Sequence, residues 1–387
     1  MEPTGTHDER ERHVMTDTLD QNCDFIMLIG AGASSDIGYL SLSDFVPGLD
    51  SNNPLHQMIS RIYADICIQK FHQTAPFEEL IVKLKYYKRL ANSIKTDVIL
   101  GDVYGFNNGV KNSSAEALFG SVLDECYSIM AKSYGPNTID RKKKEFQFLP
   151  NFYEKIARAK NNKLHIYTTN YDCAYQVLAS NYDNITFMTH ISNKEKRGQF
   201  RDNWYHIRSD LEKKALPQVF IHRLHGCVAW FDKPDLNGGI GHTAEIYGAG
   251  GTDEIYVPPD DLRHMCIKLI DHQFLGTNHV FSSAFEEFNN QLKIIDILLV
   301  WGYSFRDIEV TRQINQALIA REKKPFRIYY IDPYLTEYAA LENIHNTLKT
   351  VPVQISDSFE PHKIDWTPTD GRDKLVEKVL TLVESGD

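Results

Sequence analysis

The sequence predicts an α/β fold in which helices cover both faces of a parallel sheet. One observation is a set of short, mainly apolar stretches typical of strands buried on both faces. These stretches are residues 25–30, 163–170, 218–226, 294–304 and 326–332. A second observation is that helical patterns separate several of them, for example at residues 152–162 and 309–324. Strands that alternate with helices are typical of a Rossmann-like parallel sheet.

The first 24 residues differ from the rest of the chain. They are polar and charged, and they contain no apolar segment of the kind found in a secretion signal. We expect residues 1–24 to form a polar N-terminal tail, either loose or docked on a partner. Residues 25–387 are expected to form one domain with insertions.

Two insertions interrupt the predicted order of strands and helices. The first follows the first strand, where three stretches carry apolar residues at helical spacing: residues 54–73, 77–94 and 114–135. They predict a helical insertion over about 54–160. A second insertion, over about 190–290, is mixed in character and includes a glycine-rich segment.

The C-terminal part of the chain predicts two more elements. Residues 350–355 are expected to form an edge strand, because Pro352 lacks the N–H group that a central strand needs. Residues 371–385 have the spacing of an amphipathic helix that closes the fold.

Composition and charge exclude several classes of protein. The formal net charge is −10, so we expect no strong direct nucleic-acid binding, which requires basic surfaces that displace counterions. The six cysteines include no C-x-x-C pair, which argues against a disulfide framework or a zinc ribbon. No apolar run is long enough to span a membrane. These features predict a cytoplasmic protein without membrane association.

The first predicted strand runs directly into Gly30-Ala31-Gly32. A strand that ends in Gly-x-Gly before a helix lets backbone N–H groups approach a pyrophosphate, whose charge the helix N-terminus favours. However, Ser35 replaces the third glycine of the dinucleotide fingerprint, and the region where a dehydrogenase has its second strand has a loop composition. The turn is therefore either a phosphate cradle or a tight turn after a buried strand.

Polar or small residues follow the other predicted strands as well. Asn170 and Asp172 follow the second strand, and each either caps the next helix or contacts a ligand. The remaining ones are His225 after the third strand, Gly302 and Ser304 after the fourth, Asp307 as a cap of the next helix, and Asp332 after the fifth. Ligands bind at the carboxyl edge of an open parallel sheet, where an acid can also bind ribose hydroxyls. These residues therefore predict one binding site at that edge.

In chain order, these segments resemble the pattern of the sirtuin-like NAD-binding family. The matching segments are GAGAS (30–34), TTNYD (168–172), LHG (224–226) and GYS (302–304). The resemblance implies an NAD-binding domain over residues 25–387. Protein deacylases of this family carry two C-x-x-C zinc pairs, which are absent here, and an arginine where this chain has Val46 after Asp44-Phe45.

The TTNYD segment and the helical insertion resemble instead the bacterial anti-phage branch of the family, whose members hydrolyse NAD and deplete the infected cell of it. This resemblance implies that NAD is a substrate and that no zinc or other metal is needed. It also implies a homo-oligomer and a partner such as a HerA-type hexameric ATPase. Two alternatives stay open: a non-enzymatic sensor of NAD or ADP-ribose, and a zinc-free protein deacylase.

The resemblance further implies a role for each residue of the site. His225 would be the general base, and Asn170 would orient the water or the nicotinamide ribose. The backbone N–H groups of Gly30, Ala31 and Gly32 would hold the pyrophosphate. The other contacts would be Asp172 with the nicotinamide side or its loop, Ser34, Gly302 and Ser304 with phosphate or ribose, and Asp332 with the adenosine ribose.

Overall fold

The computed structural model describes most of the chain. The described residues are 25–35, 39, 49–69, 77–94, 115–135, 138, 144–191, 197–207, 215–232, 246–249, 264–267, 279–332, 335–349, 353–364 and 371–385. The predicted N-terminal tail, the segment around Asp44 and Val46, and parts of the 190–290 insertion lie outside the described residues.

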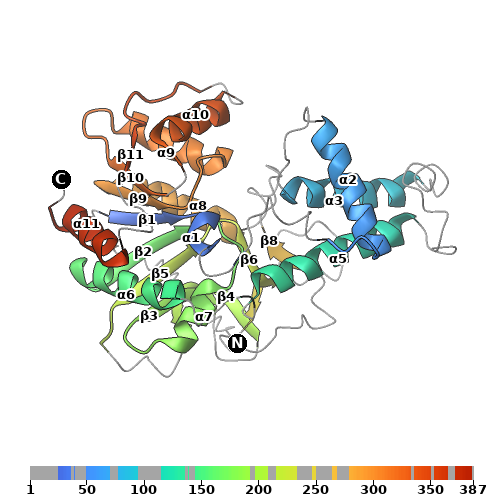
Figure 1. Cartoon of the computed structure of the whole chain (residues 1–387), viewed down its shortest axis with the longest axis horizontal. Coiled ribbons are helices and arrows are strands. Elements are labelled where there is room, and N and C mark those ends of the chain that lie inside the picture. The colour runs from blue at the N-terminus through green and yellow to red at the C-terminus, as the bar shows by residue number, and fades with distance from the viewer. Residues whose placement is uncertain are drawn as a thin grey trace, which may run out of the picture.

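The described strands form one sheet, in the spatial order β11-β10-β9-β1-β2-β5-β3-β4-β7-β6-β8. The first seven in this order pair in parallel and form the centre of the molecule (Figure 1). They are β1 (Phe25–Ile29), β2 (Lys163–Thr168), β3 (Thr186–Ile191), β5 (Gln218–Arg223), β9 (Ile297–Trp301), β10 (Arg327–Ile331) and β11 (Pro361–Lys363). The predicted α/β fold with a parallel sheet is confirmed.

Four further strands extend the sheet in antiparallel pairing, beyond β3. They are β4 (Arg197–His206), β6 (Gly226–Asp232), β7 (Ile246–Ala249) and β8 (His264–Ile267). All four belong to the second, mixed insertion. The change from parallel to antiparallel pairing therefore coincides with the part of the sequence where the alternation of strand and helix is lost.

The side chains of β1 explain why the strand is apolar throughout. All five of its residues are buried. Phe25, Met27 and Ile29 belong to one apolar cluster, whereas Ile26 and Leu28 belong to another. Successive side chains of a strand point to opposite faces of the sheet. Each face therefore has its own hydrophobic core, and neither face of β1 meets water.

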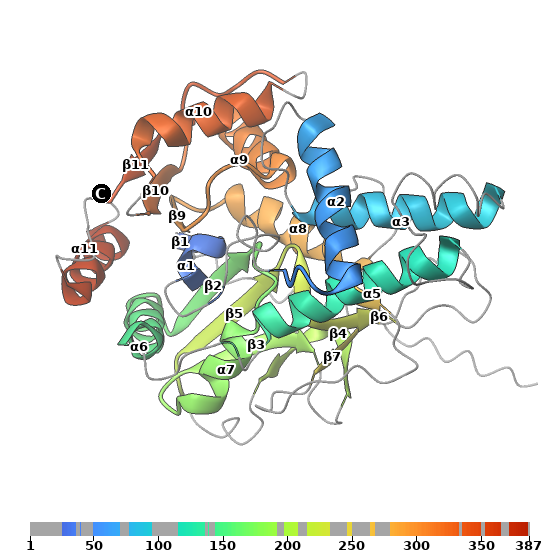
Figure 2. The same ribbon diagram turned by 45° about the vertical axis from the view of Figure 1, so that its right-hand side comes forward.

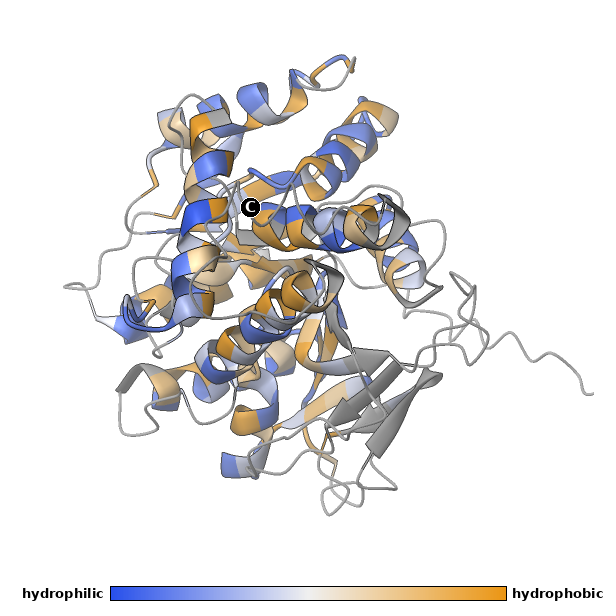
Figure 3. Cartoon of the chain, turned by 90° about the vertical axis from the view of Figure 1, so that its right-hand side faces the viewer, coloured by the Kyte–Doolittle hydropathy of each residue, from blue (hydrophilic) through white to orange (hydrophobic). Residues whose placement is uncertain are grey.

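Two layers of helices enclose the parallel sheet (Figure 1). The cluster that contains Met27 also includes residues of α6 (Lys144–Ala159), α7 (Ala174–Asn181) and α11 (Arg372–Ser385). The cluster that contains Leu28 includes residues of α8 (His279–Leu292), α9 (Ile308–Ala320) and α10 (Glu337–Leu348). Hydrophobic and hydrophilic residues share these helices, as amphipathic packing requires (Figure 3). The helix predicted at residues 371–385 is confirmed as α11, which packs on α6.

The helical insertion after the first strand is also confirmed. Its helices α2 (Pro54–Gln69), α3 (Phe77–Ile94) and α5 (Ala115–Tyr134) pack on one another and project from one side of the sheet (Figures 1 and 2). Buried residues such as Ile59 and Phe119 lie between them. Of these helices, α5 packs against β6. Within the described part of the chain, no helix has the length and apolarity that a bilayer-spanning segment needs.

Of the edge strand predicted at residues 350–355, residues 350–352 lie outside the described residues, and residues 353–355 do not form a strand. The described edge strand is β11, a short segment further along the chain that pairs with β10. Around residue 355 the backbone instead binds the buried side chain of Asn315 on α9. Its Nδ2 donates to Gln354 O (2.8 Å), and its Oδ1 accepts from Ser356 N (2.8 Å). A side-chain amide thus satisfies backbone groups that would otherwise need a neighbouring strand.

Strand register brings the carboxyl ends of the central strands level with one another. Ile29, the last residue of β1, is the Cα partner of both Thr168 and Trp301. These two residues end β2 and β9, and they are in turn the partners of Arg223 and Ile331, which end β5 and β10. The segments that follow these five strands therefore begin at one common edge of the sheet.

Candidate functional site

The glycine turn after β1 packs directly against the turn after β9. Gly30 N donates to Trp301 O, and Gly32 N donates to Gly302 O, both at 2.9 Å. A Cβ atom on Gly30 would lie 2.5 Å from Gly302 O. Because no side chain fits between the two backbones, the tight approach itself requires glycine there.

This contact differs from the expectation that the backbone N–H groups of the glycine turn hold a pyrophosphate. The N–H groups of Gly30 and Gly32 donate to carbonyl groups of the chain and are not available to a pyrophosphate. Ala31, between them, is exposed at the start of the short helix α1 (Ala31–Ser35). The interpretation as a tight turn after a buried strand therefore accounts for the backbone hydrogen bonds of both glycines, and Ala31 and Gly32 are the exposed residues of the segment.

Asn170 joins the loop after β2 to the glycine turn. Its Nδ2 donates to Gly30 O (3.0 Å) and to Ser34 Oγ (2.9 Å), and its backbone N–H donates to Thr168 Oγ1 (3.1 Å). The residue is only 5% exposed, and among the described residues its Oδ1 has no hydrogen-bond partner. A buried amide oxygen without a partner is costly in a folded protein. It is therefore a place where a ligand or a water molecule can bind.

Asp172 lies in the same loop and is buried. Its Oδ1 accepts a hydrogen bond from the backbone N–H of Ala174 (3.0 Å), the first residue of α7. The capping interpretation is therefore satisfied. Burial raises the pKa of Asp172, and the positive charge of Arg223, together with hydrogen bonds that include one from Ser34, partly offsets that rise. Predicted residues from two distant segments thus meet around this carboxylate.

His225 lies between β5 and β6, where Gly226 turns the chain with a φ of +81°. Its Nε2 is 2.6 Å from Oδ2 of Asp307, and its side chain is 14% exposed. The contact does not have hydrogen-bond geometry, so we describe it as a close imidazole–carboxylate pair. A carboxylate this close favours a proton on Nε2. In the neutral imidazole, that proton leaves the lone pair on Nδ1.

Asp307 is held in place by the helix that it caps, as the sequence predicted. Its Oδ1 accepts from Glu309 N (2.9 Å) and Val310 N (3.0 Å) at the start of α9. The other oxygen is the one that faces His225. One carboxylate therefore combines a structural role with a contact to the predicted general base, and the sequence indicated only the first of these.

The residues after β9 and β10 have structural contacts of their own. Gly302 has a φ of +61° and donates its N–H to Ile331 O (3.0 Å). Ser304 accepts a hydrogen bond from Asn343 Nδ2 through its backbone oxygen (2.9 Å). Asp332 Oδ1 accepts from Leu335 N (3.0 Å), which begins the turn toward α10. The described contacts thus bring together the glycine turn, Ser34, Asn170, Asp172 and Gly302, whereas Ser304 and Asp332 lie along the same edge without a described contact to Asn170.

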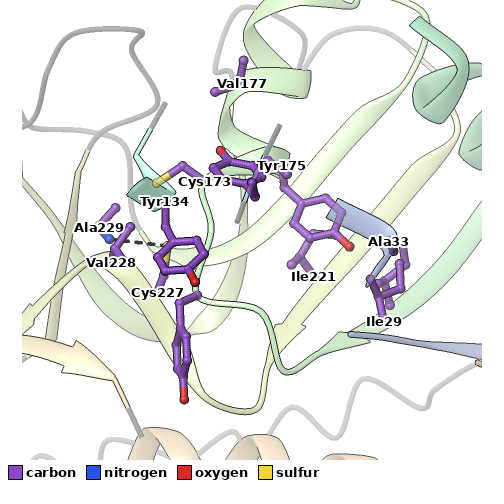
Figure 4. Packing of buried hydrophobic residues seen from close by; sticks show 14 of the residues in the cluster. Ile29, Ala33, Tyr134, Cys173, Tyr175, Val177, Ile221, Cys227, Val228 and Ala229 are labelled. Atoms are coloured by element: carbon purple, nitrogen blue, oxygen red, sulfur yellow. Dashed lines mark hydrogen bonds between the residues drawn. The ribbon is translucent and has the colours of Figure 1, made fainter. Parts of the chain in front are cut away.

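Sequence reasoning missed the buried residues that hold the loop after β2 in place. Cys173 is the last residue of this loop and Cys227 lies in β6, and both are buried beside Tyr134, the last residue of α5 (Figure 4). Cys173 N donates to Tyr134 O (3.0 Å), and Cys227 Sγ donates to Asp172 O (3.5 Å). Arg223 is buried next to them. The available signal for it was a cationic residue at the end of the strand 218–223, whose centre, residues 219–221, is apolar.

In the described segments, no group of three His, Cys, Asp or Glu side chains could hold a metal ion. Comparison with known proteins adds little to the geometry. No protein-family model and no curated protein matches the sequence. Among solved structures, the chain is similar to the "crystal structure of a Sir2 homolog-NAD complex", with 10% sequence identity, a TM-score of 0.42 and an alignment that covers 94% of this chain and 90% of the other.

Proposed function

We propose that the chain is an NAD hydrolase, which uses water to cleave the bond between nicotinamide and ribose. The observation that supports this proposal is the arrangement at the carboxyl edge of the sheet. A histidine paired with a carboxylate lies there, and so does a buried amide oxygen that has no described partner. These are the groups that general-base catalysis and substrate orientation require.

The proposed reaction begins with a leaving group that is already cationic. The bond between ribose C1′ and the pyridinium nitrogen breaks, and its electron pair neutralises the nicotinamide ring. A water oxygen forms the new bond to C1′, and the proton that it loses passes to Nδ1 of His225. Asp307 stabilises the imidazolium that results. The products are nicotinamide, ADP-ribose and one proton.

Asn170 and the glycine turn are proposed to position the substrate. The free Oδ1 of Asn170 would accept a hydrogen bond from the attacking water or a ribose hydroxyl. Exposed Ala31 and the hydroxyl of Ser34 would face the phosphates. Ser304 and Asp332 are proposed as ribose contacts, because they follow neighbouring strands at the same edge.

The biological setting is proposed from the sequence resemblance alone. In this proposal the hydrolase depletes cellular NAD in defence against phage, acts as a homo-oligomer, and is controlled by a partner such as a HerA-type hexameric ATPase. A toxic NAD hydrolase must be restrained until it is triggered, so a purified chain that is silent must also be assayed with that class of partner.

The test is incubation of the purified chain with NAD, with and without an acylated peptide, followed by chromatography of the products. The proposal expects equal amounts of nicotinamide and ADP-ribose without peptide, and a loss of at least about 100-fold in rate for His225→Ala and Asn170→Ala. Circular dichroism of both variants serves as the folding control. Nicotinamide release that depends on peptide would identify a deacylase, and NAD binding without any release, with the partner present, would identify a sensor.

A further inference from the structure

Arg223 is a charged residue buried almost completely at the end of a central strand. It is 4% exposed. Its Nη1 donates to Asn170 O (3.3 Å), and its Nη2 donates to Gln176 Oε1 (3.0 Å). The guanidinium carbon also lies 5.7 Å from the ring centre of Tyr175. From the end of β5, the guanidinium group of Arg223 therefore contacts three residues of one segment, residues 170–176.

A buried cation is expensive, since removing it from water costs several kcal/mol before any partner compensates. An apolar side chain of similar length would fill the same place more cheaply. The carboxyl group of Asp172, which is itself 2% exposed, is one of the acidic groups that act on this charge, after the thiol of Cys227. Retention of both charges in the interior therefore needs a reason other than stability.

Position in the sheet suggests that reason. Arg223 is the Cα partner of Thr168, and Leu224 N donates to Thr168 O (2.9 Å). Two residues after Thr168 comes Asn170, and two residues after Arg223 comes His225. The side chain of Arg223 thus connects the loop that carries Asn170 and Asp172 to the end of β5, two residues before the proposed base.

We propose that Arg223 is a positioning residue of this site, which fixes the loop 170–176 against the end of β5, two residues before His225. The inference rests on the proposed function, because it assigns the role of Arg223 in that same site. Arg223 touches neither substrate nor water in this scheme, and it acts through Asn170 and Asp172.

The surroundings of Asp172 make its charge state depend on Arg223. Asp172 in turn acts on titratable groups from several elements: Tyr39, Tyr153, Tyr175, Cys173 and Cys227. Against the effect of burial, a hydrogen bond with Cys173 and the charge of Arg223 lower the pKa of Cys227 to about 7. Burial raises the pKa of each of the three tyrosines, so they stay neutral near pH 7. Among the groups that act on Asp172 in the described part of the chain, Arg223 supplies the positive charge.

The test compares Arg223→Met, which removes the charge, with Arg223→Lys, which keeps it, and measures kcat and KM for NAD cleavage between about pH 5 and pH 9. For Arg223→Met we expect kcat to fall by about 100-fold with a smaller change in KM. The acid limb of the rate should also move to higher pH by about one unit or more, because Asp172 is harder to ionise without the cation. For Arg223→Lys we expect the acid limb of the wild type but a lower kcat, because one ammonium group cannot reach both acceptors.

Gln176→Leu is the matched control, because it removes one hydrogen bond of Arg223 but not its charge. Its acid limb should stay at the wild-type position. Unchanged kcat and an unchanged acid limb in Arg223→Met would overturn the inference. If Arg223→Met does not fold, Arg223→Lys decides: a wild-type kcat would overturn the inference, and a reduced kcat with an unmoved acid limb would support it.

A measurement without NAD separates this inference from the proposed function. Urea unfolding of the wild type, Arg223→Met, Asp172→Asn and the double variant gives the coupling between the two charges. Coupling that fades as pH falls through the pKa of Asp172 supports an interaction between the two charges even if no variant, wild type included, cleaves NAD. In that case only the proposed function fails. Wild-type cleavage of NAD without any such coupling would instead remove the role given to Arg223.

Discussion

Gly302 and Ala33 approach each other so closely that a Cβ atom on Gly302 would lie 2.1 Å from the backbone nitrogen of Ala33. The φ of Gly302 is +61°, a conformation that residues with a side chain rarely adopt. Two independent constraints therefore act on one residue: the local backbone conformation and the distance to the glycine turn after β1.

Comparison of the stabilities of Gly302→Ala and Gly371→Ala separates the effect of the backbone conformation from that of the close packing. Gly371 also has a positive φ, of +80°, but a Cβ atom there would meet nothing within 4 Å. We expect Gly371→Ala to lower the free energy of unfolding by about 1 kcal/mol, from backbone strain alone. Gly302→Ala should lower it by about 3 kcal/mol or more, because the backbones must also separate. Urea unfolding measures both, and equal losses would contradict the close packing of the two turns.

Asp307→Asn tests the His225–Asp307 pair without removal of the helix cap. Asparagine caps helices as well as aspartate does, so we expect the free energy of unfolding to change by less than about 1 kcal/mol. The variant loses the carboxylate charge beside the imidazole, and kcat for NAD cleavage should fall by about 10-fold to 100-fold. Asp307→Ala is the comparison, since it should lose both the cap and the activity. Full activity in Asp307→Asn would show that the pair has no part in the reaction.

Asn170 and Ser34 can be compared in the same way, because they share a hydrogen bond. Ser34→Ala removes that bond and the hydrogen bond of Ser34 with Asp172, and it should reduce the rate of NAD cleavage by about 10-fold. Asn170→Ala also leaves Gly30 O without its donor and removes the free Oδ1, so activity should be lost. We expect the variant to lose about 1–3 kcal/mol of stability as well. Steady-state kinetics and urea unfolding of both variants test this order, and a larger activity loss in Ser34→Ala would reverse it.

The buried histidines of the sheet predict how stability depends on pH. His165 Nδ1 lies 3.0 Å from His222 Nε2, and both side chains are buried. Burial lowers the pKa of His165 from 6.5 to about 4, with a smaller contribution from Lys163. Between these two pH values the unfolded chain binds more protons than the folded chain does. Stability is therefore fully present above about pH 6.5 and falls as the pH drops toward 4.

Protonation of His165 should lower the free energy of unfolding by about 3 kcal/mol between pH 6.5 and about pH 4, because each unit of pKa difference corresponds to about 1.36 kcal/mol. His165→Asn keeps a polar group in place of Nδ1 but cannot be protonated in this range. Its unfolding free energy should therefore decrease less steeply below pH 6.5 than that of the wild type. His345→Asn, at an exposed position, provides the control and should follow the wild type. An unaltered slope in His165→Asn would exclude His165 as the source of acid instability.

Most of the parallel sheet could be predicted because β1, β2, β5, β9 and β10 are buried and largely apolar. The edge strand could not. β11 is three residues long, with the sequence Pro-His-Lys, and it carries no hydrophobic pattern. β3 also escaped prediction, because it begins the region where parallel pairing ends and antiparallel pairing starts. Strands of that kind are defined by their neighbours more than by their own residues.

The candidate site was predictable as a set of strand ends but not as a set of contacts. The sequence placed His225 and Asp307 after different strands, and nothing in it indicated that they would touch. Gly30 and Gly32 were expected to face a ligand, whereas their N–H groups bind the turn after β9. Arg223 lies in a strand where a charge could equally have marked a solvent-facing position. Contacts of this kind depend on the relative placement of strands, which a single sequence does not encode locally.

The hydrogen bond between Cys173 N and Tyr134 O gives the loop after β2 a second anchor, outside the parallel sheet. Tyr134 ends α5, a helix of 20 residues whose length is about 30 Å. A helix of this length is stiff. A displacement of its N-terminal end, near Ala115, would therefore also move Tyr134 and, through the hydrogen bond, Cys173 next to Asp172. A protein that binds and moves the projecting helices α2, α3 and α5 would therefore act on the loop after β2 without approaching the carboxyl edge of the sheet.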